Sequence, residues 1–235
     1  MSRRGPQPYL EALADLFYPR WCVGCGRRSS DVLCRRCFEA LPLTGAPTCG
    51  RCGLPAAFET PVCEACKGVD FAFETARAPL RYEGVGKEVV HALKYRDQTP
   101  VVERLAAPLL AGAVARTFEN GRFDAVVPVP LHRSRLRRRG FNQAALLARG
   151  LATRINTPVS DTLQVVRSTR DQVDLSAAER RENVAGAFSA RARARGRLLV
   201  VDDVFTTGAT TNACAASLLR AGAAEVHAVT LCRTC

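Results

Sequence analysis

One stretch of the chain decides the fold: Leu198-Leu199-Val200-Val201-Asp202-Asp203-Val204-Phe205-Thr206-Thr207-Gly208-Ala209-Thr210-Thr211. Its four leading apolar residues predict a strand that is buried on both faces and ends at two carboxylates. A Thr- and Gly-containing loop follows, and then an Ala- and Leu-rich helix that we expect at 212–219, ending near Gly222. This strand–loop–helix order predicts an α/β domain whose ligands bind at the carboxyl ends of a mainly parallel sheet.

The loop predicts a ligand that carries both a phosphate and adjacent hydroxyls. Backbone N–H groups at a helix N-terminus and Thr hydroxyls suit an anion, and Asp202 and Asp203 add acceptors for a diol. A ribose 5-phosphate has both features. An ordinary strand with acidic residues at its end is the alternative, whereas the P-loop pattern G-x-x-x-x-G-K-[ST] is absent from the sequence.

The whole stretch resembles the motif that binds phosphoribosyl pyrophosphate (PRPP) in type I phosphoribosyltransferases. The resemblance implies that Asp202 and Asp203 hold the ribose hydroxyls. It also implies that the loop surrounds the 5-phosphate with Thr206, Thr207, Gly208, Ala209 and Thr210.

The charge of the chain indicates an anionic ligand. The formal net charge is +12, and most of the excess falls after residue 70. Such a basic domain suits a phosphorylated small molecule or a nucleic acid. No apolar run approaches the roughly 20 residues that span a bilayer, and residues 1–20 lack the apolar segment of a signal peptide. We therefore expect a cytoplasmic protein without membrane insertion.

Four Cys-x-x-Cys pairs fill the N-terminal quarter: Cys22/Cys25, Cys34/Cys37, Cys49/Cys52 and Cys63/Cys66. Two such pairs complete a tetrahedral zinc site with four thiolates. The intervals fit two successive sites, although interleaved pairing stays open. Disulfides are disfavoured without an export signal, and a redox-active pair would occur singly at the start of a helix. We expect two structural Zn²⁺ ions, because a four-cysteine site leaves no open coordination position.

A second strand and loop precede the central stretch. Residues 124–127 predict a short buried strand that runs into Pro128, Val129, Pro130 and Leu131, a loop stiffened by proline. An arginine-rich run, which includes Arg138 and Arg139, follows this loop. Guanidinium groups hold a diphosphate bidentately, but the run also fits a nucleic-acid patch or a solvated charged surface.

Together these motifs resemble the ComF family of phosphoribosyltransferase-like competence proteins. The resemblance extends from Cys22 to about Thr230 and includes Lys94-Tyr95-Arg96 and the run from Arg139 to Gln143. It implies a type I phosphoribosyltransferase-like α/β fold, with a mainly parallel sheet, helices on both faces and a small N-terminal zinc-ribbon domain. The expected organisation is an N-terminal helix at 1–19, a double zinc ribbon at 20–70 and the phosphoribosyltransferase-like domain at 71–235.

The ComF resemblance also assigns roles to single residues. Pro128 to Leu131 form the pyrophosphate loop, and a polar segment around Gln172 and Arg180 forms a lid over the site. Separately from the resemblance, Arg180 and the run from Arg137 to Arg139 are candidates for neutralising the diphosphate. Lys94 and Gln172 are further candidates for substrate contacts.

Two functions follow from these expectations. The first is an enzyme, a phosphoribosyltransferase that uses PRPP with Mg²⁺ and an acceptor that the sequence does not identify. Its catalytic candidates are Asp202, Asp203 and Arg180. The second is a non-catalytic accessory factor of DNA uptake that binds single-stranded DNA, or DNA-uptake proteins, through the ribbon and the basic stretch. The aromatic content of 6% argues against the second, because single-strand binders usually stack bases on aromatic rings.

Overall fold

The computed structural model describes residues 21–95, 98–118, 122–167 and 177–235, so the helix expected at 1–19 lies outside the described residues. The helical elements are α2 Arg35–Glu39, the 3-10 turn η1 Glu64–Cys66, α3 Gly84–Tyr95, α4 Gln98–Val101, the π-helical turn η2 Val102–Ala106, α5 Ala107–Thr117, α6 Arg133–Arg139, α7 Gln143–Ile155, α8 Ala177–Val184 and α9 Ala209–Arg220. The strands are β1 Ala76–Arg77, β2 Leu80–Arg81, β3 Ala125–Pro128, β4 Leu163–Val165, β5 Phe188–Ala190, β6 Arg197–Phe205 and β7 Glu225–Arg233.

The main sheet is parallel and has the order β1-β7-β6-β3, with β2 also paired to β7 beyond β1. β6 and β7 are the two long central strands, and they pair in register from Arg197 with Glu225 to Phe205 with Arg233. β4 and β5 form a separate antiparallel hairpin. The expected fold class is confirmed.

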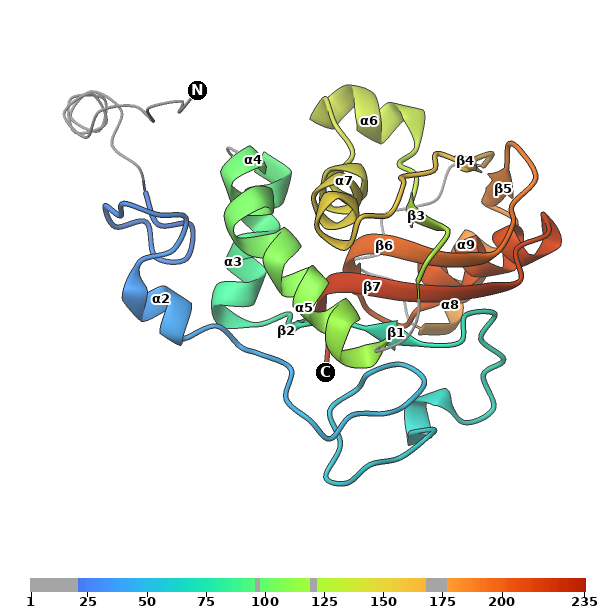
Figure 1. Cartoon of the computed structure of the whole chain (residues 1–235), viewed down its shortest axis with the longest axis horizontal. Coiled ribbons are helices and arrows are strands. Elements are labelled where there is room, and N and C mark those ends of the chain that lie inside the picture. The colour runs from blue at the N-terminus through green and yellow to red at the C-terminus, as the bar shows by residue number, and fades with distance from the viewer. Residues whose placement is uncertain (1–20, 96–97, 119–121, 168–176) are drawn as a thin grey trace, which may run out of the picture.

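Apolar side chains of the central strands point alternately to the two faces of the sheet, and both faces are buried. Leu199 and Val201 of β6 pack with α3, α5 and α7, while Leu198 and Val200 pack with α9 on the opposite face. Successive side chains of a strand point to opposite faces, so a continuous apolar run requires a helical layer on each side. Figure 1 shows these layers, with α3, α5 and α7 on one side of β6 and β7 and α9 on the other.

β6 is longer than the sequence indicates. We expected it to end before the two carboxylates, but it continues to Phe205 because β7 runs beside it as far as Arg233. Asp202 and Asp203 therefore lie within the strand, and Asp202 pairs with Thr230 of β7. α9 likewise begins at Ala209, three residues earlier than expected.

The arginine run after the second loop is a helix, α6, not an extension of the loop. The His132 side chain accepts a hydrogen bond from the Ser134 amide and so caps the start of α6, and Gly140 ends it in the left-handed conformation at φ 80°. Such a cap and stop define a helix even where like charges are adjacent.

The two cysteine-rich loops lie against different parts of the sheet domain. Cys22 and Cys37 of the first pack with Leu80 and Val89 in the core that includes α3. The second packs with Phe71 and Phe73 beside the β1 edge. In Figure 1 the first loop lies beside α3 and α4, and the second lies below β1. Within the described ranges, no helix has the length and apolarity to cross a membrane.

Candidate functional site

A pocket of about 480 Å³ opens at the carboxyl ends of β3 and β6. Its volume falls in the usual range of small-molecule sites, and its position is the one where parallel α/β sheets bind ligands. The residues that line it include Tyr82, Lys94, Val129, Pro130, Leu131, His132, Arg135, Arg139, Asn142, Gln143, Val184, Phe188, Asp202, Asp203, Thr206, Gly208, Ala209, Thr210 and Thr234.

The two carboxylates of β6 meet different surroundings. The Asp203 Oδ2 atom lies 3.3 Å from Lys94 Nζ of α3. The Asp202 Oδ1 atom accepts a hydrogen bond of 2.9 Å from the Asp203 amide. Asp203 is thus ion-paired with Lys94, whereas the backbone amide of the next residue orients the Asp202 carboxylate.

The surroundings of Asp202 disfavour its ionised form. Burial raises its pKa well above the ordinary value, and the neighbouring Asp203 carboxylate raises it further, while the Asp203 amide and Lys94 oppose the shift. A ligand that brings hydroxyl donors or a cation to Asp202 would stabilise its ionised form. This environment suits a ribose diol or a metal-bound polyphosphate.

The loop after β6 makes an anion site at the start of α9. Gly208 has φ 76° and directly precedes α9. The first N–H groups of a helix have no partner within the helix and attract anions. Thr206, Ala209 and Thr210 line the pocket beside it. Thr207 does not: its Oγ1 accepts from the Ala209 amide at 3.4 Å and borders a neighbouring hollow with Phe71.

The loop after β3 is held tightly and offers few amides. Pro128 and Pro130 have no N–H, and the Val129 amide donates to the Val201 carbonyl at 2.9 Å. Leu131 is the remaining amide of this segment. Asn142 fixes the loop from the other side, because its Nδ2 donates to the Val129 carbonyl at 3.0 Å. Residues 129–131 therefore form a fixed wall of the pocket, while Pro128, the last residue of β3, is buried and does not line it.

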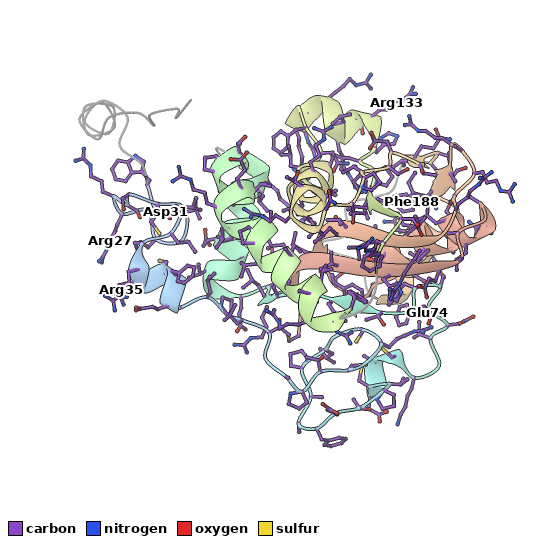
Figure 2. All side chains as sticks on the ribbon, viewed as in Figure 1. Arg27, Asp31, Arg35, Glu74, Arg133 and Phe188 are labelled. Atoms are coloured by element: carbon purple, nitrogen blue, oxygen red, sulfur yellow. The ribbon has the colours of Figure 1, made fainter. Side chains whose placement is uncertain are left out.

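The arginines of α6 separate into pocket residues and surface residues. Arg135 and Arg139 line the pocket, whereas Arg138 is exposed and does not. Arg133 is exposed as well, and Figure 2 shows it on the outer side of α6. Cations at the pocket rim favour a diphosphate there.

Gln143 is a pocket residue that the sequence reasoning did not assign. Its side chain is only 3% exposed. Its Oε1 accepts from Arg139 Nη1 at 3.2 Å, while its Nε2 has no hydrogen-bond partner among the described residues. A buried amide group without an acceptor is costly, so this donor indicates a ligand oxygen in the pocket. The only signal in the sequence was its place in the motif after Gly140.

Part of the pocket wall is apolar. Val184 of α8 and Phe188 of β5 are buried and line the pocket, and Val165 of β4 joins them. Tyr82 and Thr234 line the end of the pocket near Lys94. These residues were not predicted, because apolar side chains on short strands carry no motif.

Each cysteine cluster has the geometry of a tetrahedral metal site. The structure brings together Cys22, Cys25, Cys34 and Cys37 in one cluster and Cys49, Cys52, Cys63 and Cys66 in the other, with all sulfurs of a cluster within 4.8 Å of one another. Zn–S bonds of about 2.3 Å in a tetrahedron give S···S edges of about 3.8 Å. The recorded edges are 3.8, 3.7 and 3.7 Å, and the cysteines are free of disulfides. The pairing is therefore successive, and the donor set fits structural zinc.

The protonation of the first cluster also suits a cation. Burial opposes ionisation of Cys22, but N–H groups of Cys34, Cys25 and Gly24 lower its pKa to about 7. Burial and hydrogen bonds with the neighbouring sulfurs raise the pKa of Cys37 to about 12. Thiolate is the form that binds a metal, so a cation bound among these sulfurs would favour ionisation of Cys37.

Comparison with known families agrees with this two-part arrangement. A family model described as a double zinc ribbon domain matches residues 13–67. A model described as a phosphoribosyl transferase domain matches residues 105–234, which is more than half of the chain.

Relatives match most of the chain. The DNA utilization protein YhgH of Salmonella typhimurium is 36% identical over 190 residues, which cover 79% of this chain and 84% of that protein. The chain belongs to the ComF/YhgH family. Competence protein F of Haemophilus influenzae is 29% identical over 228 residues, covering 92% of this chain and 98% of that protein. Competence protein ComFC of Bacillus subtilis is 25% identical over 218 residues, covering 88% and 86%.

In this ComF/YhgH-family chain the pocket contains most of the residues that the sequence analysis singled out. Those that line it are Lys94, Val129, Pro130, Leu131, Arg139, Asp202, Asp203, Thr206, Gly208, Ala209 and Thr210. Pro128, Arg138 and Thr207 lie nearby without lining it. Gln172 falls outside the described residues, and so does the side chain of Arg180, a residue of α8.

Proposed function

We propose that this protein binds PRPP and transfers its phosphoribosyl group to a nitrogen nucleophile. One observation carries the proposal: the carboxylates of β6, the loop at the start of α9 and the arginines of α6 all line one pocket. PRPP needs these three surroundings at once, for its diol, its 5-phosphate and its diphosphate.

The proposal places each part of PRPP against named groups. Asp202 and Asp203 accept hydrogen bonds from the ribose hydroxyls. Thr206, Gly208, Ala209 and Thr210 hold the 5-phosphate together with the first turn of α9. The Leu131 amide, the Gln143 Nε2 and the Arg139 guanidinium face the diphosphate, and a bidentate guanidinium would hold it in one orientation.

In the proposed reaction the nucleophile forms a bond to C1 of the ribose while the bond from C1 to the diphosphate oxygen breaks. The leaving diphosphate keeps the electron pair. Mg²⁺, when bound to the diphosphate, would neutralise this charge. Asp202 and Asp203 support the positive charge that develops on the sugar ring, and Arg139 and Arg135 stabilise the leaving group. The protein contributes mainly position and electrostatics.

The apolar part of the pocket wall supports transfer to an acceptor. Val184 and Phe188 keep water away from one side of the ribose, because their side chains are buried and border the pocket. Exclusion of water protects a ribosyl cation from hydrolysis. The reduced thiols of both clusters suit a reducing compartment, so the proposal keeps the expected cytoplasmic location.

A pyrophosphate-release assay tests the transfer. Wild-type protein, PRPP and Mg²⁺ are incubated with a panel of nucleobases, amines and ammonia. We expect release that depends on one acceptor and disappears in Asp202→Asn. Tight PRPP binding without release for any acceptor would assign the protein a PRPP-sensing role instead.

The first cysteine loop favours a second candidate function, binding of single-stranded nucleic acid. Trp21 is 55% exposed and Phe38 is 59% exposed, although large aromatic rings are usually covered. Arg27 and Arg35 are exposed on the same loop, and Figure 2 shows both projecting from it. Aromatic rings beside cations form a platform on which bases stack, and relatives carry the names DNA utilization protein and competence protein.

Trp21 gives a direct assay for this second function, because it is the single tryptophan of the chain. Stacking of a base on its ring would quench its fluorescence as single-stranded DNA is added. We expect quenching that weakens with salt and with Phe38→Ala. Unchanged fluorescence at low salt, with no DNA shift in a gel, would exclude this surface.

A further inference from the structure

We propose that the second cysteine cluster, with Cys49, Cys52, Cys63 and Cys66, supports the 5-phosphate loop and that Arg233 is the positioning residue between them. The inference rests on the proposed function, since the loop is the one assigned to the 5-phosphate of PRPP. It assigns the second metal site a role in ligand binding beyond folding of the ribbon.

Arg233 connects the cluster to the end of β6. Its side chain is buried at the end of β7, and its Nη1 donates to the carbonyl of Cys52, a residue of the cluster. Its guanidinium carbon lies 5.4 Å from the centre of the Phe205 ring, a cation–π contact. The Phe205 carbonyl also accepts from the Thr234 amide at 2.9 Å. Arg233 thus holds the last residue of β6 against the cysteine loop.

The Phe205 ring in turn supports the centre of the phosphate loop. A side-chain carbon added at Gly208 would lie 2.7 Å from the Phe205 ring and 3.2 Å from the Phe71 ring. The backbone of Gly208 therefore rests directly on these two rings. Phe73 completes the support, since it stacks on Phe71 at 4.7 Å between ring centres and meets Phe205 edge-on at 6.0 Å.

A second connection reaches the same rings from within a Cys-x-x-Cys turn. Arg51 lies between Cys49 and Cys52, and its Nη2 donates to the Phe71 carbonyl at 2.7 Å. The next residue, Ala72, donates its amide to Asn212 Oδ1 in the first turn of α9 at 2.6 Å. The turn that binds the metal thus fixes both the support of Gly208 and the start of the helix.

The first cluster has a different neighbourhood and serves as the internal comparison. Cys22 and Cys37 pack in the core with α3 on the other face of the sheet, and Asp31 of this loop lies 3.6 Å from Arg104. Loss of metal there should leave the rings beneath Gly208 in place. Loss of metal at the second cluster frees the Cys52 carbonyl and Arg51, so the loop should loosen.

Arg77 provides a matched control for Arg233. Arg77 also lies beside the second cluster, although it is only half-buried, and its Nη1 donates to the Gly50 carbonyl at 3.0 Å. Both arginines lie near the cysteine sulfurs, but the ring contact to Phe205 belongs to Arg233. Comparing Arg233→Met with Arg77→Met therefore separates the contact with Phe205 from the loss of a positive charge near the metal.

Hydrogen exchange of full-length, zinc-loaded protein tests the connection without any ligand. We expect amides in 204–212 to exchange roughly tenfold faster in Arg233→Met, with Arg77→Met close to wild type. Arg233→Lys, which keeps the charge but not the planar group, should lie between them. Equal exchange in all four proteins at equal zinc content would overturn the connection.

PRPP titration then tests the consequence. We expect Arg233→Met to bind PRPP roughly tenfold more weakly, the size of one lost charged hydrogen bond, and Arg77→Met to bind within about twofold of wild type. Cys49→Ser with Cys52→Ser should lower affinity more than Cys22→Ser with Cys25→Ser, each at one zinc per chain. If wild type fails to bind PRPP, the proposed function fails while the exchange result still decides the connection. If all variants bind equally, the connection fails alone.

Discussion

Lys94 Nζ lies 3.3 Å from Asp203 Oδ2, across a contact between α3 and the end of β6. This contact gives the two adjacent carboxylates of β6 different surroundings. Asp203 has a cation beside it, whereas burial and Asp203 together raise the pKa of Asp202. Asp203 therefore has a cationic partner, whereas the surroundings of Asp202 disfavour its charged form. Two predictions follow from this difference.

Asp202→Asn should stabilise the protein without ligand. A carboxyl whose pKa is raised on folding contributes stability below its unfolded pKa and loses that contribution as pH rises through the folded value. The wild type loses this contribution as pH rises above the unfolded pKa, whereas asparagine stays neutral at every pH and its Oδ1 can still accept from the Asp203 amide. Melting should rise by about 2–4 °C for each kcal/mol gained. The gain should shrink toward pH 4, and a lower melting temperature at pH 7 would contradict the burial of Asp202.

PRPP affinity should fall on acidification because protonation removes the negative charge of Asp202 and turns one of its acceptor oxygens into a donor. Since its pKa is raised, the loss should begin at a higher pH than for an ordinary aspartate. Lys94→Met should move it to higher pH still, because Lys94 opposes the shift. PRPP titrates too, so the comparison is the difference between wild type and Lys94→Met in calorimetry across pH 5–8. If the PRPP affinities of wild type and Lys94→Met depend on pH in the same way, Lys94 does not influence Asp202 in the site.

Arg139 and Arg138 form a neighbouring pair with opposite expectations. Arg139 lines the pocket and holds Gln143, while Arg138 is exposed outside it. Arg139→Met should weaken PRPP binding by roughly tenfold or more, the value of a charged hydrogen bond. Arg138→Met should change it by less than about twofold, as surface substitutions do. Equal losses for both would indicate a diffuse electrostatic effect.

Purified protein should carry two zinc ions per chain, one for each four-cysteine cluster. Cys25→Ser and Cys63→Ser should each remove one ion, and elemental analysis of reduced protein measures this directly. Acidification should release the metal, because its ligands are thiolates. Zinc contents that fall to zero in either single variant would show that the sites fold as one unit.

Much of the fold and pocket was predictable because local signals agreed with the tertiary structure. The apolar run from Leu198 to Val201 predicted a strand buried on both faces, and the sheet with helices on each side confirms it. The cysteine pairs predicted two four-cysteine sites, and their intervals fitted successive pairing without excluding interleaved pairing; the sulfur positions show that the pairing is successive.

The remaining features depended on contacts between distant residues. The length of β6 is set by its pairing with β7, which no local pattern encodes. α6 was missed because five arginines in seven residues look like a solvated run, and the cap at His132 is a side-chain role that histidine rarely plays. Gln143 looks like an ordinary residue at the start of a helix in the sequence, and only its burial, with no partner for Nε2 in the part of the chain that the structure describes, sets it apart.

Calorimetric titration of PRPP with Mg²⁺ into wild type and into the variant with both Asp202→Asn and Asp203→Asn tests the central claim most directly. The double variant keeps the shape of both side chains and both cysteine clusters, so it should remain folded with two zinc ions. We predict that wild type binds PRPP and that the double variant loses at least about 100-fold in affinity, as expected when two hydrogen-bond acceptors lose their negative charge and one oxygen of each becomes a donor group. Equal affinity of the two proteins would contradict the assignment of this pocket to PRPP.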